Sequence, residues 1–403
     1  MTLFNFNVRI ICRGEYEARR NYKTYGMPIY MDRHDVSEAV TAEYVAQLHQ
    51  QDLKVQDQFG CRGLTYWFDD KRKTAFCLIE APNMKALEDM HNHAHGQVPH
   101  RIIEVEPSIV ESFLGRIEDP KKTKDTELNI IDDPAFRVIM IIELKQQVLF
   151  RGTSEQFQSS LKDFNREVID LLGAFGGKPV RQTDYYYLVS FPSVSNAVHA
   201  ALNIQSAFHD TSNGDLKNNI ILKVGLSAGV PVTEKQQIFE DTIKIAEQIC
   251  QVIKSEIVVT SEVRHLYESE NVDIFHENEK VIALTKEDEK FIAAFMDHMG
   301  AVWNNVNLKV DDFTKRVGHS KSQVYRKMML LTGKSPNTFI KDYRLNEAVK
   351  LLNKNAGNIS DIAFETGFSS PSYFSKCFQK KYGHFPSGYL VARTSTATEK
   401  QTA

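Results

Sequence analysis

The chain has few of the features that mark secreted or membrane proteins. Its five cysteines, Cys12, Cys61, Cys77, Cys250 and Cys377, are an odd number and never form a Cys-x-x-Cys pair. No apolar run approaches the ~18 residues that cross a bilayer. The N-terminus lacks an apolar stretch followed by a small-residue cleavage site. We therefore expect no disulfide framework, no signal peptide and no membrane span, and a reducing cytoplasm as the location.

Net charge is also scarce, but it is unevenly distributed. The whole chain carries −3. The residues from Lys286 to the end hold 18 Lys and Arg against 11 Asp and Glu, a net of +7, so the preceding 285 residues hold 31 against 41, a net of −10. A basic block on an acidic body is typical of a separate module that binds a polyanion, although a chance fluctuation of surface charge has the same appearance.

Changes in composition and pattern divide the chain into several parts. A length of 403 residues, of which 42% are hydrophobic and 25% charged, predicts two to four ordinary globular domains. The predicted boundaries are 1–26 for an N-terminal tail, 27–119 for a first domain, 120–134 for a charged, proline-bounded linker, 135–285 for a second domain, 286–391 for a helical third domain and 392–403 for a C-terminal tail.

The first two domains are predicted to mix strands and helices, so the fold class is multidomain α+β. In the first domain, β-prone runs at 28–32, 63–68, 75–80 and 101–105 enclose helical stretches at 41–59 and 83–95. The order β-α-β-β-α-β is the ferredoxin-like arrangement. In the second, strand-like runs at 138–144, 184–191, 220–232 (as a strand pair) and 257–263 alternate with helices at 154–175, 193–209 and 241–253, which predicts an α/β domain.

The third domain contains an internal repeat. The first copy is VDDFTKRVGHSKSQVYRKMMLLTGKSP, at 310–336, and the second is ISDIAFETGFSSPSYFSKCFQKKYGHFP, at 359–386. Gly318 corresponds to Gly367, 49 residues later. Each copy predicts a short helix, a glycine turn that favours positive φ, and a second helix.

The second helix of each copy is amphipathic. Its apolar face holds Val324, Met328 and Leu331 in the first copy and Phe374, Phe378 and Tyr382 in the second. Ser320 and Ser369 are the expected N-caps. A short capped helix with polar donors near its N-terminus and an apolar back suits the major groove. Residues 336–354 predict one helix that joins the units, so that both can enter successive grooves.

These motifs resemble the AraC/XylS-type DNA-binding domain. The second copy, ISDIAFETGFSSPSYFSKCFQKKYG followed by HFPSGY, and the connector YRLNEAVKLL carry the resemblance, which runs from about Glu287 to Leu390 and covers about a quarter of the chain. The resemblance implies a bacterial, sequence-specific transcription regulator with two helix-turn-helix units. A helical bundle that repeats by chance is the alternative.

The same resemblance implies which side chains face DNA. The base-facing candidates are Ser322, Gln323 and Arg326 in the first recognition helix and Pro371, Ser372 and Lys376 in the second. Lys321, Lys327 and Lys380 are expected at phosphates, and Ser320, Ser370 and Tyr373 complete the expected set. Arg326 is the expected guanine contact, since a bidentate Arg on guanine is the commonest direct readout. A solvated helix surface is the alternative for each residue.

The second domain resembles the class III nucleotidyl cyclase homology domain. The matching stretches include RVIMIIEL, LLGAFGGKPVRQTDYYYLVSF, LKVGLSAGVPV and DTIKIAEQICQVIKSEIVVTSEV. An active cyclase of this class requires two metal-binding aspartates and an Asn–Arg pair. Those positions hold Glu143, Asp184 without its following glycine, Lys244 and Gln248 here. Because Gln cannot replace a cationic, bidentate Arg, we expect no catalysis, and a domain that binds a small ligand or dimerises.

The first domain resembles a small ferredoxin-like family described as nickel-binding-like. The stretches MPIYMDRHDV, QFGCRGLTYWFDD and AFCLIEAPNMKALEDMHNHAHG carry the resemblance. The domain holds six of the 13 histidines, and His91 and His95 are four residues apart on a predicted helix. These two, with His49, are the candidate ligands of a divalent metal such as nickel.

Two alternatives to a metal site remain open in this domain. A helix end followed by Gly96 favours cationic residues in its last turn without any metal. A metal-free ligand pocket around Tyr66, Trp67 and Glu80 is the other alternative.

The sequence as a whole predicts an AraC-type regulator of promoter DNA. The first two domains would sense a ligand or metal, dimerise, or both. The expected partners are double-stranded DNA, a second copy of the chain and RNA polymerase. An enzyme with a DNA-binding appendage and a scaffold with a vestigial DNA-binding domain are the competing interpretations. The basic face at Lys321, Arg326 and Lys376 argues against the scaffold.

Overall fold

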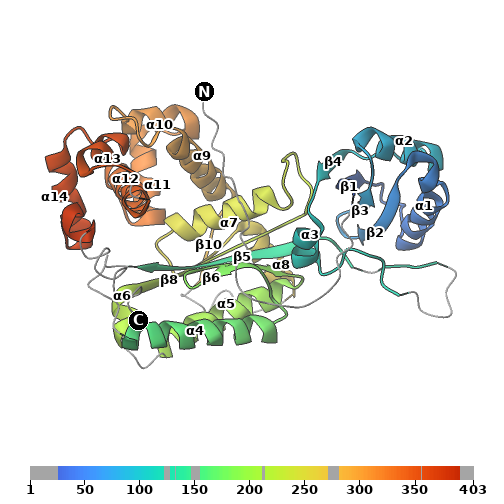
Figure 1. Cartoon of the computed structure of the whole chain (residues 1–403), viewed down its shortest axis with the longest axis horizontal. Helices are drawn as coiled ribbons and strands as arrows, with labels where there is room; N and C mark the ends of the chain where they lie inside the picture. Colours follow the sequence, from blue (N-terminus) through green and yellow to red (C-terminus); the bar gives the residue numbers. More distant parts are fainter. Residues whose placement is uncertain are drawn as a thin grey trace.

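The computed structural model describes residues 26–121, 128–131, 133–146, 155–210, 214–270, 281–354 and 356–390. The predicted tails, apart from Gly26, lie outside this range, as do residues 122–127 and 132 of the predicted linker. Figure 1 shows two sheet-containing regions and a helical C-terminal region, which confirms the multidomain α+β class. None of the described helices is long and apolar enough to cross a membrane.

The N-terminal domain has the predicted element order. Its elements are β1 (Ile29–Asp35), α1 (Ala42–Val55), a short 3-10 helix (Gln56–Phe59), β2 (Arg62–Asp69), β3 (Thr74–Glu80), α2 (Met84–Ala94) and β4 (Arg101–Glu104). The antiparallel sheet has the order β2-β3-β1-β4, which is the ferredoxin-like arrangement. An additional helix, α3 (Pro107–Leu114), was not predicted; a proline stands at its start and Gly115 at its left-handed end.

The middle domain is a six-stranded sheet with helices on both faces. Its elements are β5 (Arg137–Gln146), α4 (Glu155–Ala174), β6 (Lys178–Thr183), β7 (Tyr186–Phe191), α5 (Val194–Asp210), α6 (Gly214–Asn219), β8 (Ile220–Gly229), α7 (Glu240–Val252), β9 (Ile257–Val259), α8 (Ser261–Glu270) and β10 (Val281–Ala283). The strand order is β10-β9-β8-β5-β7-β6.

Three predictions for this domain were wrong in detail. Residues 220–232 contain one strand, β8, and not a strand pair: it ends at Gly229, and the chain leaves the sheet before Pro231, which has no N–H for a ladder hydrogen bond. The strand expected over 257–263 ends at Val259, and Ser261 begins α8. The strand expected from Asp184 begins at Tyr186, because residues 184–185 form the turn of the β6–β7 hairpin.

The C-terminal domain consists of helices and the loops that join them within its described residues, with no strand, as predicted. Its helices are α9 (Lys286–Val302), α10 (Val310–Val317), α11 (Lys321–Thr332), α12 (Pro336–Asn353), α13 (Ile359–Glu365) and α14 (Pro371–Tyr382). α10 and α11 form the first helix-turn-helix unit, and α13 and α14 form the second. The expected turn glycines, Gly318 and Gly367, have φ of 66° and 78°. Both values lie in the left-handed region that glycine enters without steric cost.

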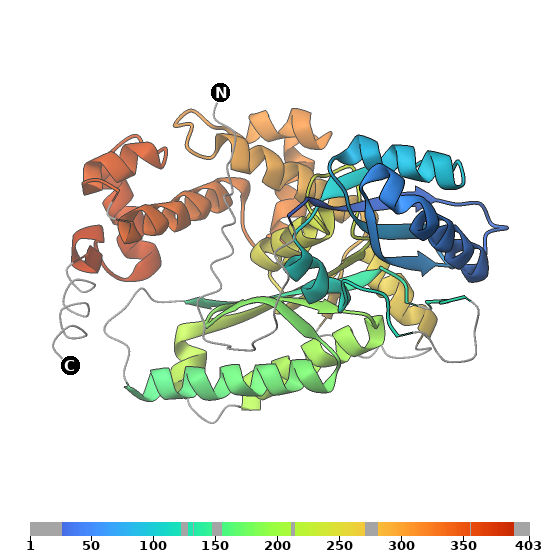
Figure 2. The ribbon, with the colours of Figure 1, turned by 45° about the vertical axis from the view of Figure 1, so that its right-hand side comes forward.

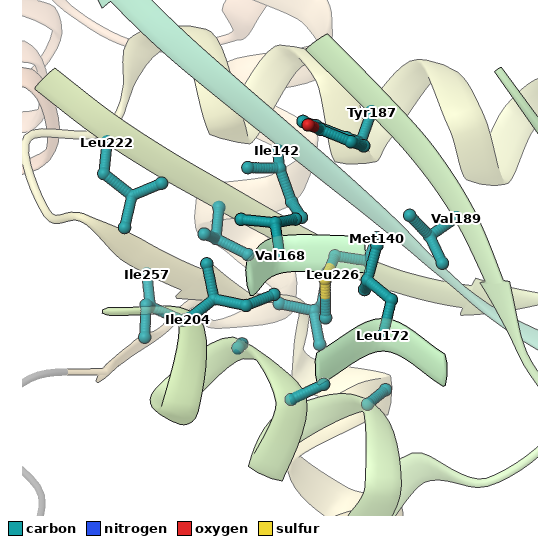
Figure 3. Close-up of a cluster of buried hydrophobic side chains, with 14 of the residues drawn as sticks. Met140, Ile142, Val168, Leu172, Tyr187, Val189, Ile204, Leu222, Leu226 and Ile257 are labelled. Atoms are coloured by element: carbon teal, nitrogen blue, oxygen red, sulfur yellow. The ribbon is translucent and has the colours of Figure 1, made fainter. Parts of the chain in front are cut away.

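Alternate residues of β5 enter two different cores. Met140 and Ile142 face α4 and α5, in the cluster that Figure 3 shows. Ile139 and Ile141 face the other side, where they pack with α7 and with the sheet of the N-terminal domain. In Figures 1 and 2 the N-terminal domain and the C-terminal helices lie on the side of the central sheet opposite α4.

Helix α7 belongs to two cores at once. Its residues Ala246 and Cys250 join the cluster shared with the N-terminal sheet. Its residues Ile249 and Val252 join a cluster that holds Phe295 of α9 and the buried residues of the first helix-turn-helix unit. The second unit has a core of its own, built on α12, α13 and α14. The first unit therefore packs on the middle domain, whereas the second is connected to it through α12.

Candidate functional site

The first recognition helix, α11, has the predicted cap. The hydroxyl of Ser320 accepts a hydrogen bond from the backbone N–H of Gln323 at 3.3 Å, and the side-chain oxygen of Gln323 accepts one from the backbone N–H of Ser320 at 2.8 Å. This capping box satisfies two N–H groups at the helix start. The amide oxygen of Gln323, a predicted base-contacting residue, is therefore used within the helix, while its NH₂ group is not needed for the cap.

The exposed face of α11 carries the predicted DNA-contacting residues. Lys321, Ser322, Gln323 and Arg326 are exposed, and Val324 and Met328 are fully buried on the opposite face. Arg326 has no ion-pair partner among the described residues.

Two of the expected phosphate contacts already hold partners. Lys321 lies 3.1 Å from the carboxylate of Asp311 on α10. Lys327 lies 2.5 Å from Asp288 on α9, with a quarter of its side chain exposed, and stands over the ring of Phe291. The partner of Lys327 is 39 residues away, and nothing in the local sequence indicated it.

The second recognition helix, α14, begins one residue later than predicted. Ser370, not Ser369, is the N-cap, and its hydroxyl accepts from the N–H of Tyr373 at 3.4 Å. The reason is Pro371, which has no N–H and a fixed φ that suits the first helical position. Ser372, Tyr373, Lys376 and Lys380 are exposed, Ser370 and Pro371 are half-buried, and Phe374 and Phe378 form the buried back.

A second candidate site lies in the N-terminal domain. Asp32 and His34 leave β1 on the same face, because alternate residues of a strand share a face. Cys77 lies opposite Asp32 in the β1–β3 register, and His91 comes from α2. One ligand atom from each of these four buried side chains lies within 4.8 Å of the others.

A second group of ligand atoms shares His91. Asp52 of α1, His91 and His95 also lie within 4.8 Å of one another. The Nδ1 of His91 is 3.1 Å from Asp52, its Nε2 is 2.9 Å from Asp32, and the Nε2 of His95 is 3.1 Å from Asp52. His91 thus bridges two buried carboxylates.

Burial opposes charge in this cluster, and ion pairing overcomes it. Burial acts to lower the pKa of His91, but the carboxylates of Asp32 and Asp52 raise it to about 10. Burial acts to raise the pKa of Asp32, but His34 and His91 hold it well below its usual range. A metal that takes an imidazole nitrogen of His91 must therefore displace a proton.

All of these side chains except that of Asp32 line a cavity of about 460 Å³. The Nε2 of His34 is buried without a hydrogen-bond partner among the described residues, although it lies 3.4 Å from Asp32. An unpartnered buried nitrogen requires an explanation, because such groups are normally satisfied. Imidazole, thiolate and carboxylate together form a donor set that fits nickel, zinc or copper.

The structure brings two of the three predicted metal ligands together. His91 and His95 belong to the cluster, but His49 does not: its Nε2 is 3.2 Å from Asp119, and its ring lies on Tyr66. His49 still lines the same cavity. The ligand groups that sequence reasoning missed are Asp32, His34, Asp52 and Cys77. The Asp-x-His spacing at 32–34, where the strand predicted over 28–32 ends, was the available indication of two of them.

The two alternatives to a metal site have different outcomes. The helix-end interpretation is confirmed as local structure, since Gly96 has a φ of 76° and its N–H donates to the carbonyl oxygen of His91. It does not compete with the cluster, which uses side chains. Tyr66 and Trp67 are fully buried core residues and do not line the cavity described above, so a pocket around them and Glu80 stays a prediction.

In the middle domain, the four positions that correspond to catalytic residues of a cyclase are exposed or interact with other residues of this chain. Asp184 is exposed in the β6–β7 turn, and Glu143 pairs with Lys145 at 3.5 Å. Lys244 and Gln248 both donate hydrogen bonds to Asp297 of α9, at 2.8 and 2.9 Å. These two positions of α7 therefore contact the C-terminal domain.

Comparison with protein families confirms both terminal resemblances. Residues 30–105 match the family described as nickel responsive protein SCO4226-like, and residues 313–391 match the helix-turn-helix domain family. The C-terminal region is thus an AraC-type helix-turn-helix domain.

Curated relatives match parts of the chain. It is 44% identical over 85 residues to histidine kinase P4 of Formosa agariphila, which covers 21% of this chain and 6% of that protein. It is 25% identical over 169 residues to the HTH-type transcriptional regulator YidL of Escherichia coli, which covers 40% and 54%. It is 34% identical over 79 residues to the HTH-type transcriptional regulator ExsA of Pseudomonas aeruginosa, which covers 20% and 28%. The chain thus spans about half or less of these relatives.

Solved structures resemble single parts of the chain. SCO4226 from Streptomyces coelicolor is 31% identical, with a TM-score of 0.18, over 19% of this chain and 94% of that one. A regulator with an AraC-type DNA-binding domain from Chromobacterium violaceum is 28% identical, with a TM-score of 0.24, over 26% and 91%. The guanylyl cyclase domain of the RhoGC fusion protein from Blastocladiella emersonii is 14% identical, with a TM-score of 0.28, over 34% and 84%.

Proposed function

We propose that this protein is a sequence-specific, DNA-binding transcription regulator whose DNA binding responds to a divalent metal in its N-terminal domain. The observation that carries the DNA-binding part is the pair of serine-capped helices, α11 and α14, in a domain of AraC type. Each helix has an apolar buried back and an exposed face of polar and basic donors, as a recognition helix in the major groove requires.

Within this function, each predicted DNA-contacting side chain has a role. Arg326 contacts guanine, and Ser322, Gln323, Pro371, Ser372 and Lys376 contact other base edges. Lys321, Lys327 and Lys380 contact phosphates, which position the protein without specifying sequence, and Ser320, Ser370 and Tyr373 lie at the helix starts beside the backbone. For Lys321 and Lys327, the phosphate competes with the carboxylates of Asp311 and Asp288.

The metal part rests on the buried cluster in the N-terminal domain. Asp32, His34, Cys77 and His91 would hold one ion, or Asp52, His91 and His95 would hold it on the other side of the shared histidine. The buried Nε2 of His34, which forms no hydrogen bond within the described residues, and the match to a nickel-responsive family favour nickel or a similar ion. When bound, the metal supplies a cross-link between β1, β3 and α2.

A contiguous set of contacts supports a route from this cluster to DNA. Arg33, which lies between Asp32 and His34, donates to the carbonyl oxygen of Val232 at 3.2 Å, in the loop that leads to α7. α7 shares a core with the first helix-turn-helix unit. After α7, the N–H of Lys254 donates to the carbonyl oxygen of Leu331 at the end of α11, at 2.9 Å. A change at β1 can therefore bias the position of α11.

The middle domain acts as a non-catalytic connector in this proposal. The pairing of Lys244 and Gln248 with Asp297 supports it, because these side chains serve a contact with the C-terminal domain. Incubation with ATP or GTP and manganese tests it, and measurable cyclic nucleotide would contradict it. Pairing with a second copy of the chain and contact with RNA polymerase complete the proposed partners.

The experiment that tests the function is selection of genomic DNA fragments by the purified full-length protein. It is run in parallel with a chelator and with added nickel. Enrichment of a short shared site in the nickel arm alone supports both parts of the proposal. Equal enrichment in both arms retains the regulator and removes the metal. No enrichment in either arm overturns the DNA-binding function.

A further inference from the structure

The two helix-turn-helix units have separate cores that meet on one helix. α12 contributes Phe339 and Ile340 to the core of the first unit. It contributes Leu345, Ala348 and Leu352 to the core of the second. The relative placement of α11 and α14 therefore depends on α12 and on whatever else joins the units beside it.

Arg344 lies on α12 at the boundary between these two cores. Its Nε donates to the carbonyl oxygen of Trp303 at 2.7 Å, and its Nη2 donates to the carbonyl oxygen of Asn305 at 2.7 Å. Both carbonyl groups belong to the loop between α9 and α10, on the side of the first unit. The planar guanidinium holds two acceptors of one loop at fixed spacing, which a lysine ammonium cannot reproduce.

The turn of the second unit closes on the same loop. Gly367 is buried, and a Cβ at this position would lie 2.8 Å from the carbonyl oxygen of Asn304 and 3.0 Å from the Nε of Arg344. No side chain fits there without a shift of backbone. The loop at 303–305 is thus held between α12 and the Gly367 turn, with the guanidinium of Arg344 at the centre of the contact.

We propose that Arg344 is a positioning residue that sets the spacing and angle between the two recognition helices. This proposal rests on the DNA-binding function proposed above. By holding the 303–305 loop against α12 and beneath the Gly367 turn, Arg344 makes the two units one rigid body. Two units held rigidly can enter two successive grooves without an entropy cost for fixing their relative orientation. Both the affinity for DNA and the preference for one spacing between the half-sites therefore depend on the contact of Arg344 with the loop.

The test uses full-length protein and the DNA site that the wild-type protein selects. Three duplexes are compared: the intact site, a site with one base pair inserted between its two halves, and a site with the half read by the second unit scrambled. We expect the wild-type protein to lose affinity on insertion. Arg344→Ala should bind the intact site about tenfold more weakly and lose much less on insertion, because its units adjust independently.

Two further variants make the result specific. Arg344→Lys keeps the stem and part of the donor set, so it should shift the insertion penalty in the same direction by a smaller amount. Lys350→Ala removes a cation of the same helix that pairs with Glu347, and it should leave the insertion penalty unchanged. The ratio of affinities for two duplexes does not depend on the fraction of folded protein, so general destabilisation alone does not change it.

The outcomes separate the two proposals. Equal insertion penalties for the wild type, Arg344→Ala and Arg344→Lys overturn the role of Arg344 and leave the DNA-binding function intact. A wild-type protein that selects no duplex overturns both.

Discussion

Arg326 and Lys380 illustrate the two kinds of DNA contact expected at the scale of single residues. Both are exposed on recognition helices. Arg326→Ala should cost about 1–3 kcal/mol of binding free energy and relax the specificity at one base position, because a bidentate guanine contact is lost.

Lys380→Ala should weaken binding to all sequences alike and reduce the salt dependence of binding. Competition binding with single-base variants of the selected site measures both. Loss of affinity without loss of specificity for Arg326→Ala contradicts its assignment.

The metal cluster makes a second prediction about single residues. His91→Ala should abolish nickel binding measured by calorimetry, because His91 belongs to both groups of ligand atoms. Cys77→Ser tests the group on β1 and β3, and His95→Ala tests the group with Asp52. His93→Ala is the matched control, since His93 is an exposed histidine of the same helix outside both groups. Unchanged nickel binding in His91→Ala, with a normal melting curve, contradicts the site.

At the scale of elements, the cap of α14 distinguishes two neighbouring serines. Ser370→Ala should cost about 1 kcal/mol of unfolding free energy, because the hydroxyl that accepts the N–H of Tyr373 is removed. Ser369→Ala is the control and should cost much less, since Ser369 is an exposed residue before the cap. Chemical denaturation of the full chain measures both. A larger loss in Ser369→Ala contradicts the placement of the helix start.

At the scale of the whole molecule, helix α7 connects the middle domain with the first helix-turn-helix unit. Ile249 is fully buried in the core of the first helix-turn-helix unit, although it lies in the middle domain. Ile249→Ala should destabilise the protein by about 2–5 kcal/mol and weaken DNA binding, because it opens a cavity behind the first unit. Ile221→Ala, at a position 37% exposed on β8, is the control. Denaturation and DNA binding check the pair, and unchanged DNA binding in Ile249→Ala at full stability contradicts the shared core.

Residues on the two sides of the predicted domain boundary at residue 285 pack against each other. β10 pairs with β9 just before α9 begins, and α9 then packs on α7 through Phe291 and Phe295. The segment from Lys286 onward differs from the preceding residues in net charge and matches a different family. The core of its first helix-turn-helix unit nevertheless includes residues of α7, which precedes the boundary. The charge count of a segment describes residues that are mostly at the surface. It does not show which buried faces pack against one another.

The sequence by itself determined the helices and glycine turns of the C-terminal domain, the cap of α11 and the element order of the N-terminal domain. These features depend on interactions between near neighbours: the positive φ of Gly318 and Gly367, the capping box at Ser320, and the periods of apolar residues in strands and helices. Even there, the proline after Ser370 moved one helix start by a residue.

Only the tertiary structure decided where these elements meet. Asp32 and Cys77 are 45 residues apart in the sequence, and the pairing of β1 with β3 brings them together. Arg344 and the 303–305 loop are about 40 residues apart, and Lys327 and Asp288 are 39 apart. Such contacts depend on strand register and helix packing over the whole chain. The same polar residues have many other potential partners in the sequence, and the packing of the buried cores selects among them.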